Sequence, residues 1–388
     1  MQDNEKKPAL RFKGFTDPWE QRKLGDITVE LSEYATQELG LPLLTSSRSG
    51  LMYQDEYRDS RTTKSTETLF SVVPVGTCTY RHMSDDDVFH MNINTLEKGL
   101  VSREYPVFEA SKGNNLEFLV QHINSSEEFK AFCAEQKKGG TRTRLYYNTL
   151  CQFTVRVPAL KEQAQISQCL KKLDTLITLH QRKYEKLVNI KKSMLDKMFP
   201  KNGASVPEIR FKGFTDLWEQ RKVREVTDRY DNLRIPVAAS LRVAGTTPYY
   251  GANGIQDYVE GYTHDGEFIL VAEDGANDLK NYPVKCVKGR IWVNNHAHVL
   301  QGKCACADNQ FLAYAISQAD IESLLVGGGR AKLNAETLMD IELLLPSKDE
   351  QIQIGHYLAR LDHLITLHQR KLEKLQNIKK SCLEKMFV

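Results

Sequence analysis

The sequence predicts a mixed α/β fold with a pseudo-two-fold internal repeat: two α/β domains joined by two long antiparallel helices that form an intramolecular coiled coil. Two duplications lead to this prediction. The phrase Leu176–Lys183 recurs letter for letter at Leu364–Lys371, and the phrase Arg11–Lys23 recurs with one change at Arg210–Lys222. The segments that these phrases enclose share almost no sequence. A repeat array keeps its core pattern in every unit, whereas here only the framing phrases are kept. A duplicated frame around diverged inserts indicates one common framework that carries two different domains.

Each copy of the first phrase lies inside a long charged run, 162–199 or 350–387, whose apolar residues step by four and three. This alternation averages about 3.5 residues, the period of a seam between paired helices. A helix of about 38 residues is about 57 Å long, far longer than an ordinary domain helix. We therefore expect the two helices to pack on each other through Leu170, Leu173, Ile177, Tyr184 and Leu187 of the first and Leu358, Leu361, Ile365, Leu372 and Leu375 of the second.

The helices divide the chain into four consecutive segments. We predict a first domain with its framing segment at 1–158, a central helix at 159–200, a second domain with its framing segment at 201–346 and a C-terminal helix at 347–388. Apolar runs bounded by turn residues predict strands within the inserts, at 68–75, 153–157, 267–272, 290–293 and 297–300. Helical spacing predicts short helices at 127–136 and 311–325.

The phrase that opens each half carries a helix-start signal. Asp17 can cap a short helix, with Glu20 at the third helical position closing a capping box, and Asp216 repeats the arrangement in the second half. Trp19 and Trp218 lie inside these phrases. A repeated aromatic next to a cap is more typical of a packing anchor than of a base-stacking residue, so we predict that both indoles are buried.

Composition gives only broad bounds. Of the 388 residues, 41% are hydrophobic and 27% charged, which is ordinary for a globular protein. The net charge of +3 does not by itself indicate a nucleic-acid partner. The first residues contain no apolar signal core, no run approaches the roughly 20 apolar residues of a membrane span, and the eight cysteines show no CxxC pair. These features predict a cytoplasmic protein with reduced thiols.

Catalytic motifs are absent from the sequence. Gly261–Gly266 has the spacing of a phosphate loop, but Glu267 stands where lysine is required. The best metal candidate is His296 and His298 followed by Cys304 and Cys306, where each pair would alternate on a strand and share one face. Zinc sites usually have wider spacings, so we predict no metal, no cofactor and no catalytic residue in this chain.

A binding surface is the remaining interpretation. Gly139–Leu145 is echoed by Gly327–Leu333, so that a glycine run with basic residues precedes each long helix by the same distance. Arginine and lysine bind phosphates, and arginine and asparagine read base edges. The candidate DNA-binding residues are Arg142, Arg144, Arg330, Lys332, Tyr249, Tyr250, Asn253, Asn294, Arg58, Arg61 and Arg81. Any one of them could instead belong to a solvated face.

These features together resemble a known family, the DNA-specificity (S) subunit of type I restriction-modification systems. The resemblance rests on the duplicated phrases at Phe12 and Phe211 and on the Glu-Gln-x-x-Ile start of each long helix at Glu162 and Glu350. The stretches 247–255 and 293–300 are also similar to one class of target-recognition domain. The resemblance covers essentially the whole chain.

The resemblance implies that each domain reads one half of a split, asymmetric double-stranded DNA site, with the helices setting the spacer. Half-sites on one face of DNA lie about 34 Å apart. It also implies two modification (methyltransferase) subunits that methylate adenine at N6 with S-adenosylmethionine, and restriction subunits that use ATP and Mg to translocate and cleave DNA. Specificity and scaffolding would fall to this chain.

Three alternatives remain open from the sequence. A stand-alone coiled-coil DNA-binding regulator would bind DNA tightly without partners. A coiled-coil interaction protein would show no DNA binding even when assembled. An enzyme built on the His296 and Cys304 pairs would need stoichiometric zinc.

Overall fold

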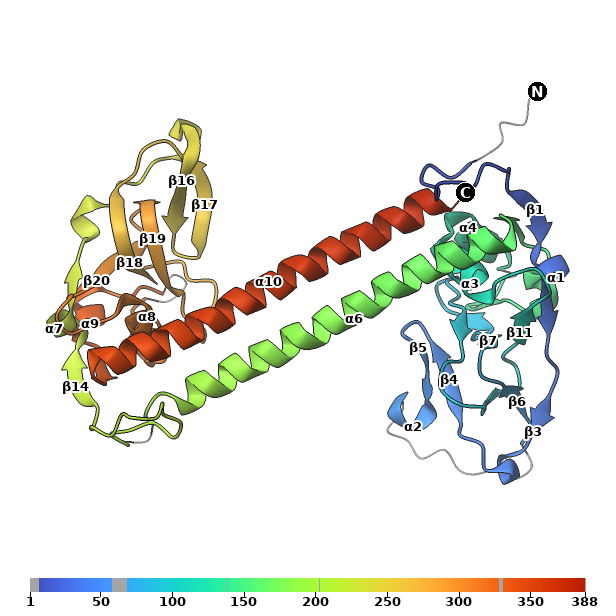
Figure 1. Ribbon diagram of the computed structural model, residues 1–388, viewed down its shortest axis with the longest axis horizontal. Helices are drawn as coiled ribbons and strands as arrows, with labels where there is room; N and C mark the ends of the chain where they lie inside the picture. The colour runs from blue at the N-terminus through green and yellow to red at the C-terminus, as the bar shows by residue number, and fades with distance from the viewer. Residues whose placement is uncertain (1–6, 58–67, 138, 202, 328–330, 388) are drawn as a thin grey trace. The chain divides into compact units, whose positions relative to one another are not determined.

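The computed structural model describes residues 7–57, 68–137, 139–201, 203–327 and 331–387. Two long helices dominate it, α6 (Leu160–Lys197) and α10 (Lys348–Met386), each drawn as one unbroken ribbon in Figure 1. The contacts group the chain into two compact units: unit 1 is 1–179 with 372–388, and unit 2 is 180–371. The four consecutive segments predicted from the sequence differ from this grouping, because each unit takes part of both helices.

Unit 1 is built from short strands. Its sheets have the strand orders β2-β11-β7-β9 and β10-β6-β3, and β1-β13, β12-β8 and β4-β5 pair separately. The strands are β1 (Glu20–Lys23), β2 (Thr28–Glu30), β3 (Tyr34–Ala35), β4 (Leu44–Ser47), β5 (Gly50–Tyr53), β6 (Phe70–Val73), β7 (Cys78–Thr79), β8 (Met83–Ser84), β9 (Asn92–Ile93), β10 (Gly99–Ser102), β11 (Val107–Ala110), β12 (Thr143–Arg144) and β13 (Thr154–Val157). The short helices are α1 (Leu24–Ile27), α2 (Gln54–Tyr57), α3 (Leu116–Ser125), α4 (Glu127–Glu135) and α5 (Tyr147–Leu150).

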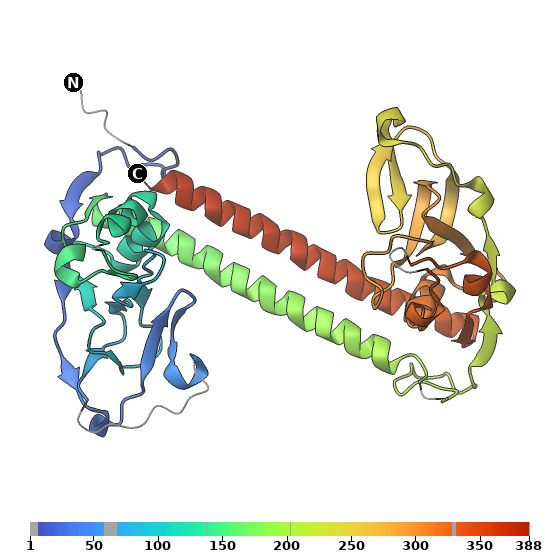
Figure 2. The ribbon, with the colours of Figure 1, turned by 180° about the vertical axis from the view of Figure 1, so that it is seen from behind.

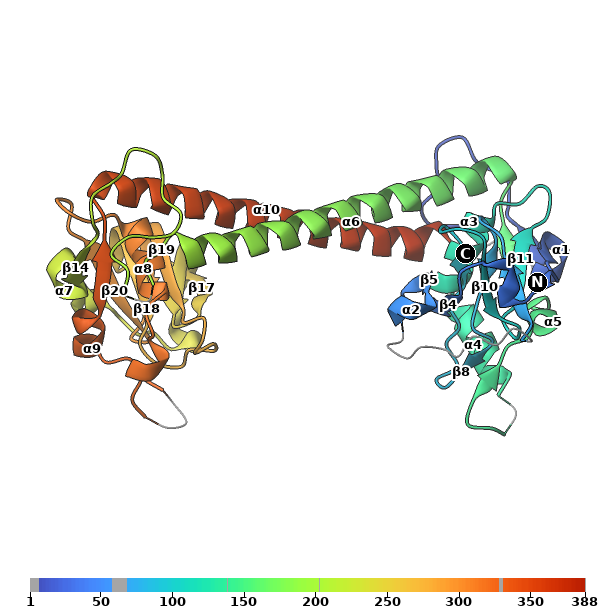
Figure 3. The same ribbon diagram turned by 90° about the horizontal axis from the view of Figure 1, so that it is seen from below.

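Unit 2 is organised around one larger sheet, with strand order β15-β20-β18-β19-β16-β17 and a separate pair β14-β21. Its strands appear in yellow-green to orange in Figure 2. They are β14 (Glu219–Lys222), β15 (Thr227–Arg229), β16 (Ala244–Gly251), β17 (Gly254–Val259), β18 (His264–Ala272), β19 (Val284–Val293), β20 (Ala297–Gly302) and β21 (Glu342–Leu345). The helices are α7 (Val223–Val226), α8 (Asn309–Ser317) and α9 (Ala335–Asp340), and α8 packs on β18 and β19 (Figure 3).

The helix predicted in each opening phrase is absent, and a strand takes its place. Residues 20–23 form β1, paired antiparallel with β13, and residues 219–222 form β14, paired in the same way with β21. Ladder hydrogen bonds to a partner strand pair more of the backbone N–H and C=O groups here than a single turn of helix would. The tryptophans are buried as predicted, since Trp19 and Trp218 are each 4% exposed.

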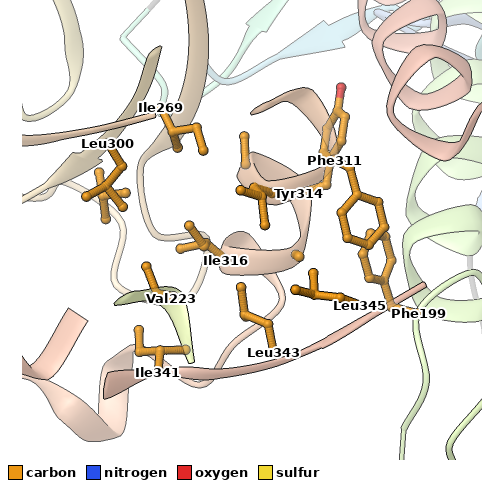
Figure 4. Packing of buried hydrophobic residues seen from close by; sticks show 14 of the residues in the cluster. Phe199, Val223, Ile269, Leu300, Phe311, Tyr314, Ile316, Ile341, Leu343 and Leu345 are labelled. Atoms are coloured by element: carbon orange, nitrogen blue, oxygen red, sulfur yellow. The ribbon is translucent and has the colours of Figure 1, made fainter. Parts of the chain in front are cut away.

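The hydrophobic cores of the two units contain equivalent aromatic contacts. In unit 1, Trp19 and Phe387 pack on Phe118 of α3, and in unit 2, Trp218 and Phe199 pack on Phe311 of α8. Figure 4 shows the core of unit 2, with Phe199 beside Phe311. The core of unit 1 thus includes the end of α10, and the core of unit 2 includes the end of α6.

The long helices pair antiparallel within each unit. In unit 1, Ile166 and Leu170 share a core with Cys382 and Met386, and Asp174 pairs with Lys379 at 2.5 Å. In unit 2, Lys191 pairs with Asp362 at 2.6 Å, and the rings of His180 and His368 meet, with 2.8 Å between their Nδ1 atoms. Of the predicted seam residues, Leu170, Leu358 and Leu361 are buried, and the half-buried ones are Leu173, Ile177, Tyr184, Leu187, Ile365, Leu372 and Leu375. The predicted fold class, two α/β domains joined by a long antiparallel helix pair, is confirmed.

None of the helices in the described ranges has an apolar stretch that could cross a membrane.

Candidate nucleic-acid interface

The two Gly-rich segments are held by equivalent backbone contacts, although the surrounding inserts differ. In unit 1, β12 pairs with β8 and the amide of Leu145 donates to the His82 carbonyl at 2.8 Å. In unit 2, the backbone of Lys332 forms an isolated antiparallel β-bridge with that of Asp274, and the amide of Leu333 donates to the Glu273 carbonyl at 2.8 Å. Leu145 and Leu333 occupy the same place in the repeat. The structure therefore holds the described ends of both segments, at Arg144–Leu145 and Lys332–Leu333, alike.

The cations of the unit 1 segment lie beside an acidic turn. Arg142 donates from Nε to Asp85 at 2.7 Å, and Lys137 lies 3.6 Å from Asp87. Thr143 is also hydrogen-bonded to Asp87. Arg142, Arg144, Gly140 and Met83 line an open hollow of about 620 Å³. The ion pairs that hold these cations are exposed and therefore weak. A phosphate can thus replace the carboxylates as their partner.

In the corresponding segment of unit 2, the exposed Lys332 joins a half-buried charge cluster. Glu273 accepts from Arg234 at 2.7 Å and from Lys332 at 2.8 Å. Burial opposes ionisation of this carboxyl, but the hydrogen bonds from Lys332 and Arg234 hold its pKa below the ordinary value. Arg234 is half-buried and also donates to the Ala297 carbonyl at 2.9 Å, so its role is structural.

Several predicted contact residues support the sheet of unit 2. Tyr249, Tyr250 and Asn294 are 1%, 6% and 4% exposed, and the Tyr249 hydroxyl accepts from the Val237 amide at 2.9 Å. Asn253 bridges two turns: its Nδ2 donates to the Gly275 carbonyl at 2.8 Å, and its Oδ1 accepts from the backbone amide of residue 277 at 2.9 Å. Three of these side chains are thus buried, and DNA contact stays a prediction for all four residues.

The remaining candidates divide into two groups. Arg81 and Arg144 are exposed and belong to unit 1, as Arg142 does. Arg58, Arg61 and Arg330 lie outside the described residues. The acidic partners Asp85, Asp87 and Glu273 were missed by the sequence reasoning, because nothing local marks a carboxylate whose cation lies about 40 to 60 positions away.

The histidine and cysteine pairs do not come together. His296 is hydrogen-bonded through Nδ1 to Asp274 at 2.5 Å, and His298 contacts Asp231 at 2.8 Å. Cys304 and Cys306 lie in a turn, and His296 lies in the turn before β20, so neither pair alternates on a strand as the sequence predicts. Backbone hydrogen bonds of the 303–307 turn replace the ladder there, because the amides of Cys306 and Ala307 donate to the Lys303 carbonyl. Within the described ranges, no three His, Cys, Asp or Glu side chains are arranged to hold a metal ion.

Comparison with known proteins agrees with this architecture. The family model of the type I restriction modification DNA specificity domain matches residues 90–189 and 215–377, which is more than half of the chain. Two repeats of a specificity domain, each followed by a long helix, define the class of the protein. The chain belongs to the type I restriction-modification DNA specificity family.

Individual relatives are matched over part of their length. A relative from Haemophilus influenzae, named as a type I restriction enzyme specificity subunit, is 44% identical over 146 residues, which span only 38% of this chain and 38% of that protein. The type I restriction enzyme MjaVIII specificity subunit of Methanocaldococcus jannaschii is 22% identical over 279 residues, 66% of each chain. The crystal structure of the S subunit from M. genitalium superposes with a TM-score of 0.69 at 12% identity, over 99% of both chains, and shows the shared fold.

Proposed function

We propose that this chain is the DNA-specificity subunit of a type I restriction-modification complex, and that each unit recognises one half of a bipartite, asymmetric site in double-stranded DNA. The observation that carries the proposal is the equivalent mounting of two Gly-rich basic segments on unlike sheets. The equivalent contacts hold the ends of the two segments alike, while the different sheets around them would make the two half-sites differ in sequence. The length of the helix pair would set the spacer between the half-sites.

The same proposal assigns catalysis to partner subunits in the cytoplasm. Two modification subunits would dock on this chain and methylate adenine at N6, and restriction subunits would translocate and cleave unmodified DNA. S-adenosylmethionine, ATP and Mg would be used by those partners, with no cofactor and no catalytic residue in this chain. The duplicated exposed surface of α6 and α10 supports two copies of one partner, because the phrase 176–183 is repeated unchanged at 364–371.

Selection of bound DNA from a random pool tests the proposal. The chain is purified alone and in complex with its modification subunits, and bound DNA is sequenced after several rounds. The complex is expected to enrich a split motif with a fixed spacer, while the chain alone binds weakly. Tight, specific binding by the chain alone would instead favour a stand-alone coiled-coil regulator.

Salt dependence adds a residue-level readout. Lys332→Gln is expected to weaken binding to all sequences and to lower the slope of log K against log salt by about one, as for the loss of one phosphate contact. Lys222→Gln is the matched control, because Lys222 is an equally exposed cation that pairs with Asp340 on the frame at 3.1 Å. An unchanged slope for Lys332→Gln would remove this residue from the interface.

A further inference from the structure

Arg142 and Asp85 face each other across two paired strands of unit 1. Strand β8 ends at Ser84 and β12 begins at Thr143, and these two residues are partners in the antiparallel ladder. Asp85 and Arg142 are the next residue on each chain and continue the same register. Side chains directly opposite each other on paired strands interact, and here Nε of Arg142 donates to Oδ1 of Asp85 at 2.7 Å.

This contact uses only one edge of the Arg142 guanidinium. A guanidinium carries five N–H donors in a planar fork, one on Nε and four on the two Nη atoms. The bond to Asp85 takes the proton on Nε, and no acceptor among the described residues is hydrogen-bonded to Nη1 or Nη2. The Arg142 side chain is 52% exposed. The guanidinium is therefore held at Nε and open to a ligand at its two Nη atoms.

The turn that carries Asp85 is fixed by the two carboxylates that follow it. Asp86 accepts from Nη2 of Arg48, and Asp87 accepts from the hydroxyl on the first residue of β12. The backbone of Asp87 has a φ of +64°, a conformation uncommon for a residue other than glycine, which persists where the surrounding contacts hold it. The turn thus orients Arg142 before any ligand binds.

The charges around this turn are balanced, whereas the donors of Arg142 are not all used. Three consecutive carboxylates pair with three cations, Arg142, Arg48 and Lys137. A phosphate at the Nη atoms of Arg142 would add an anion beside these carboxylates and would be repelled by them. The major-groove edge of guanine is neutral and offers two acceptors, O6 and N7, which match the two Nη donors.

Phosphate contacts can be made by other cations nearby. Arg81 and Arg144 are exposed, and no carboxylate of the described residues forms an ion pair with either of them. Lys137 lies 3.6 Å from Asp87 and can exchange this carboxylate for a phosphate. Arg142 needs no such exchange, because a base edge can bind its Nη atoms while Nε keeps its bond to Asp85.

The strands that carry the pair are suited to the major groove. β8 and β12 form a separate two-stranded sheet, and the major groove of B-DNA admits a two-stranded ribbon. Arg142 and Gly140 line the open hollow of about 620 Å³. Even a Cβ added at Gly140 would meet only backbone atoms of residue 142, at 3.7 and 3.9 Å. No bulky side chain at position 140 therefore blocks the approach to the guanidinium.

We propose that Arg142 reads one guanine in the half-site of unit 1 through a bidentate contact from Nη1 and Nη2, and that Asp85 is the positioning residue that orients the guanidinium. The inference rests on the proposed function, and it assigns one candidate side chain to a base edge instead of a phosphate. The two roles differ in what they predict, since a base contact specifies one position of the motif and a phosphate contact affects all sequences alike.

The first test compares the motifs selected from random DNA by complexes that contain the modification subunits. The wild type is expected to require guanine at a position where Arg142→Ala loses about tenfold or more of the preference, with the rest of the motif unchanged. Arg22→Ala is the matched control, because Arg22 belongs to an exposed ion pair with Glu20 on the frame, at 3.6 Å. It is expected to select the wild-type motif.

Asp85→Ala tests the positioning role. Its preference for the same guanine is expected to fall by about threefold or more, the cost of ordering a free arginine side chain on binding. Binding to random DNA is expected not to weaken, because the variant removes a negative charge. Glu20→Ala, the control from the frame, should change neither quantity. Asp85→Ala with the full preference for guanine would overturn the positioning role.

A modified base provides a measurement on the wild-type complex, independent of the folding of any variant. The probe is a duplex with the selected motif in which 7-deazaguanine, which lacks the N7 acceptor, replaces the assigned guanine. The wild type is expected to bind this probe about tenfold more weakly than the unmodified duplex, the effect of one hydrogen bond to a charged donor. Equal binding of the two probes would overturn the bidentate contact.

The outcomes separate this inference from the proposed function. An Arg142→Ala complex that selects the unchanged motif, while the slope of log K against log salt falls by about one, would assign Arg142 to a phosphate. That result would overturn the inference and leave the proposed function intact. A wild-type complex that enriches no split motif would overturn the proposed function itself.

Discussion

Arg11 donates from Nε and Nη2 to the two carboxylate oxygens of Glu162, at 2.7 and 2.8 Å, across 151 positions of the chain. Arg210 and Glu350 repeat this contact in the second half, with both distances 2.7 Å. The carboxylates are 1% and 0% exposed. Each opening phrase is thereby bound to the first turn of the long helix that follows its own insert. The contact fixes the start of that helix relative to its domain.

Removal of one partner of this contact should be strongly destabilising. Arg210→Ala leaves the Glu350 carboxylate buried without its cation, which costs about 3 kcal/mol or more of unfolding free energy. Urea denaturation of the full chain measures the loss. Arg221→Ala is the control, because Arg221 pairs with Glu219 and Glu225 on the surface and should cost less than about 1 kcal/mol. Equal effects of the two variants would show that the Arg210 contact has no special weight.

A glutamine beside each buried glutamate links the long helix to a short one. Gln351 accepts from the Asp308 amide at 3.0 Å and donates to the carbonyls of Pro346 and Cys306, both at 3.0 Å. Gln351→Glu cannot donate to these carbonyls and is expected to lose about 2–3 kcal/mol. Gln353→Glu places the same change two residues away on the exposed face of α10. Thermal unfolding should separate the two variants, and coincident transitions would contradict the assigned role.

The helix pair should weaken in mild acid because of His180 and His368. Their Nδ1 atoms are 2.8 Å apart, so one ring donates and the other accepts, and a second proton would break the contact. Burial lowers the pKa of His368 below 6.5, and the charges of His180, Lys183 and Lys371 lower it further. The unfolded chain then binds more protons, so stability is lost as the pH falls below about 6.5 towards the folded-state pKa.

Replacement of this histidine provides the check. His368→Leu keeps an apolar residue in the seam and removes the titrating group. The urea midpoint of the wild type is expected to fall between about pH 7.5 and pH 5.5 by more than that of the variant. Parallel changes in the two proteins would assign the acid sensitivity to other groups.

The last residues of the chain should stabilise unit 1. Phe387 stacks on His122 with ring centroids 4.9 Å apart, and the Leu10 amide donates to the Lys385 carbonyl at 2.8 Å. Phe387→Ala is expected to cost about 3 kcal/mol and to speed hydrogen exchange in α3. Phe199→Ala, the same change in the other half, is expected to speed exchange in α8 instead. A response confined to α8 for Phe387→Ala would contradict the observed grouping.

The sequence predicted the frame well because the frame is periodic and duplicated. A heptad seam needs only local spacing, so both long helices were placed within a few residues of their observed ends. Burial of Trp19 and Trp218 followed from their repetition. The strands β18, β19 and β20 were found because they are apolar runs between turn residues.

Local sequence patterns could not predict which distant segments pair with each other. The capping signal at Asp17 predicted a helix, but β1 pairs with β13, whose residues lie more than 130 positions away. Helix α3 was not predicted, although it takes the place of α8 in unit 1, with Asn115 capping the Phe118 amide as Asp308 caps that of Phe311. The burial of Tyr249 and Asn294 likewise depends on neighbouring strands, so their exposure could not be read from the loop-like sequence around them.

A methylation map tests the central claim most directly. The chain is co-expressed with its cognate modification subunit in a methylation-free host, and N6-methyladenine is located by single-molecule sequencing. We predict one split motif with two unlike halves and a fixed spacer, and Lys332→Gln should reduce its methylation. With expression and assembly of the complex verified, the absence of any new methylated motif would contradict the account.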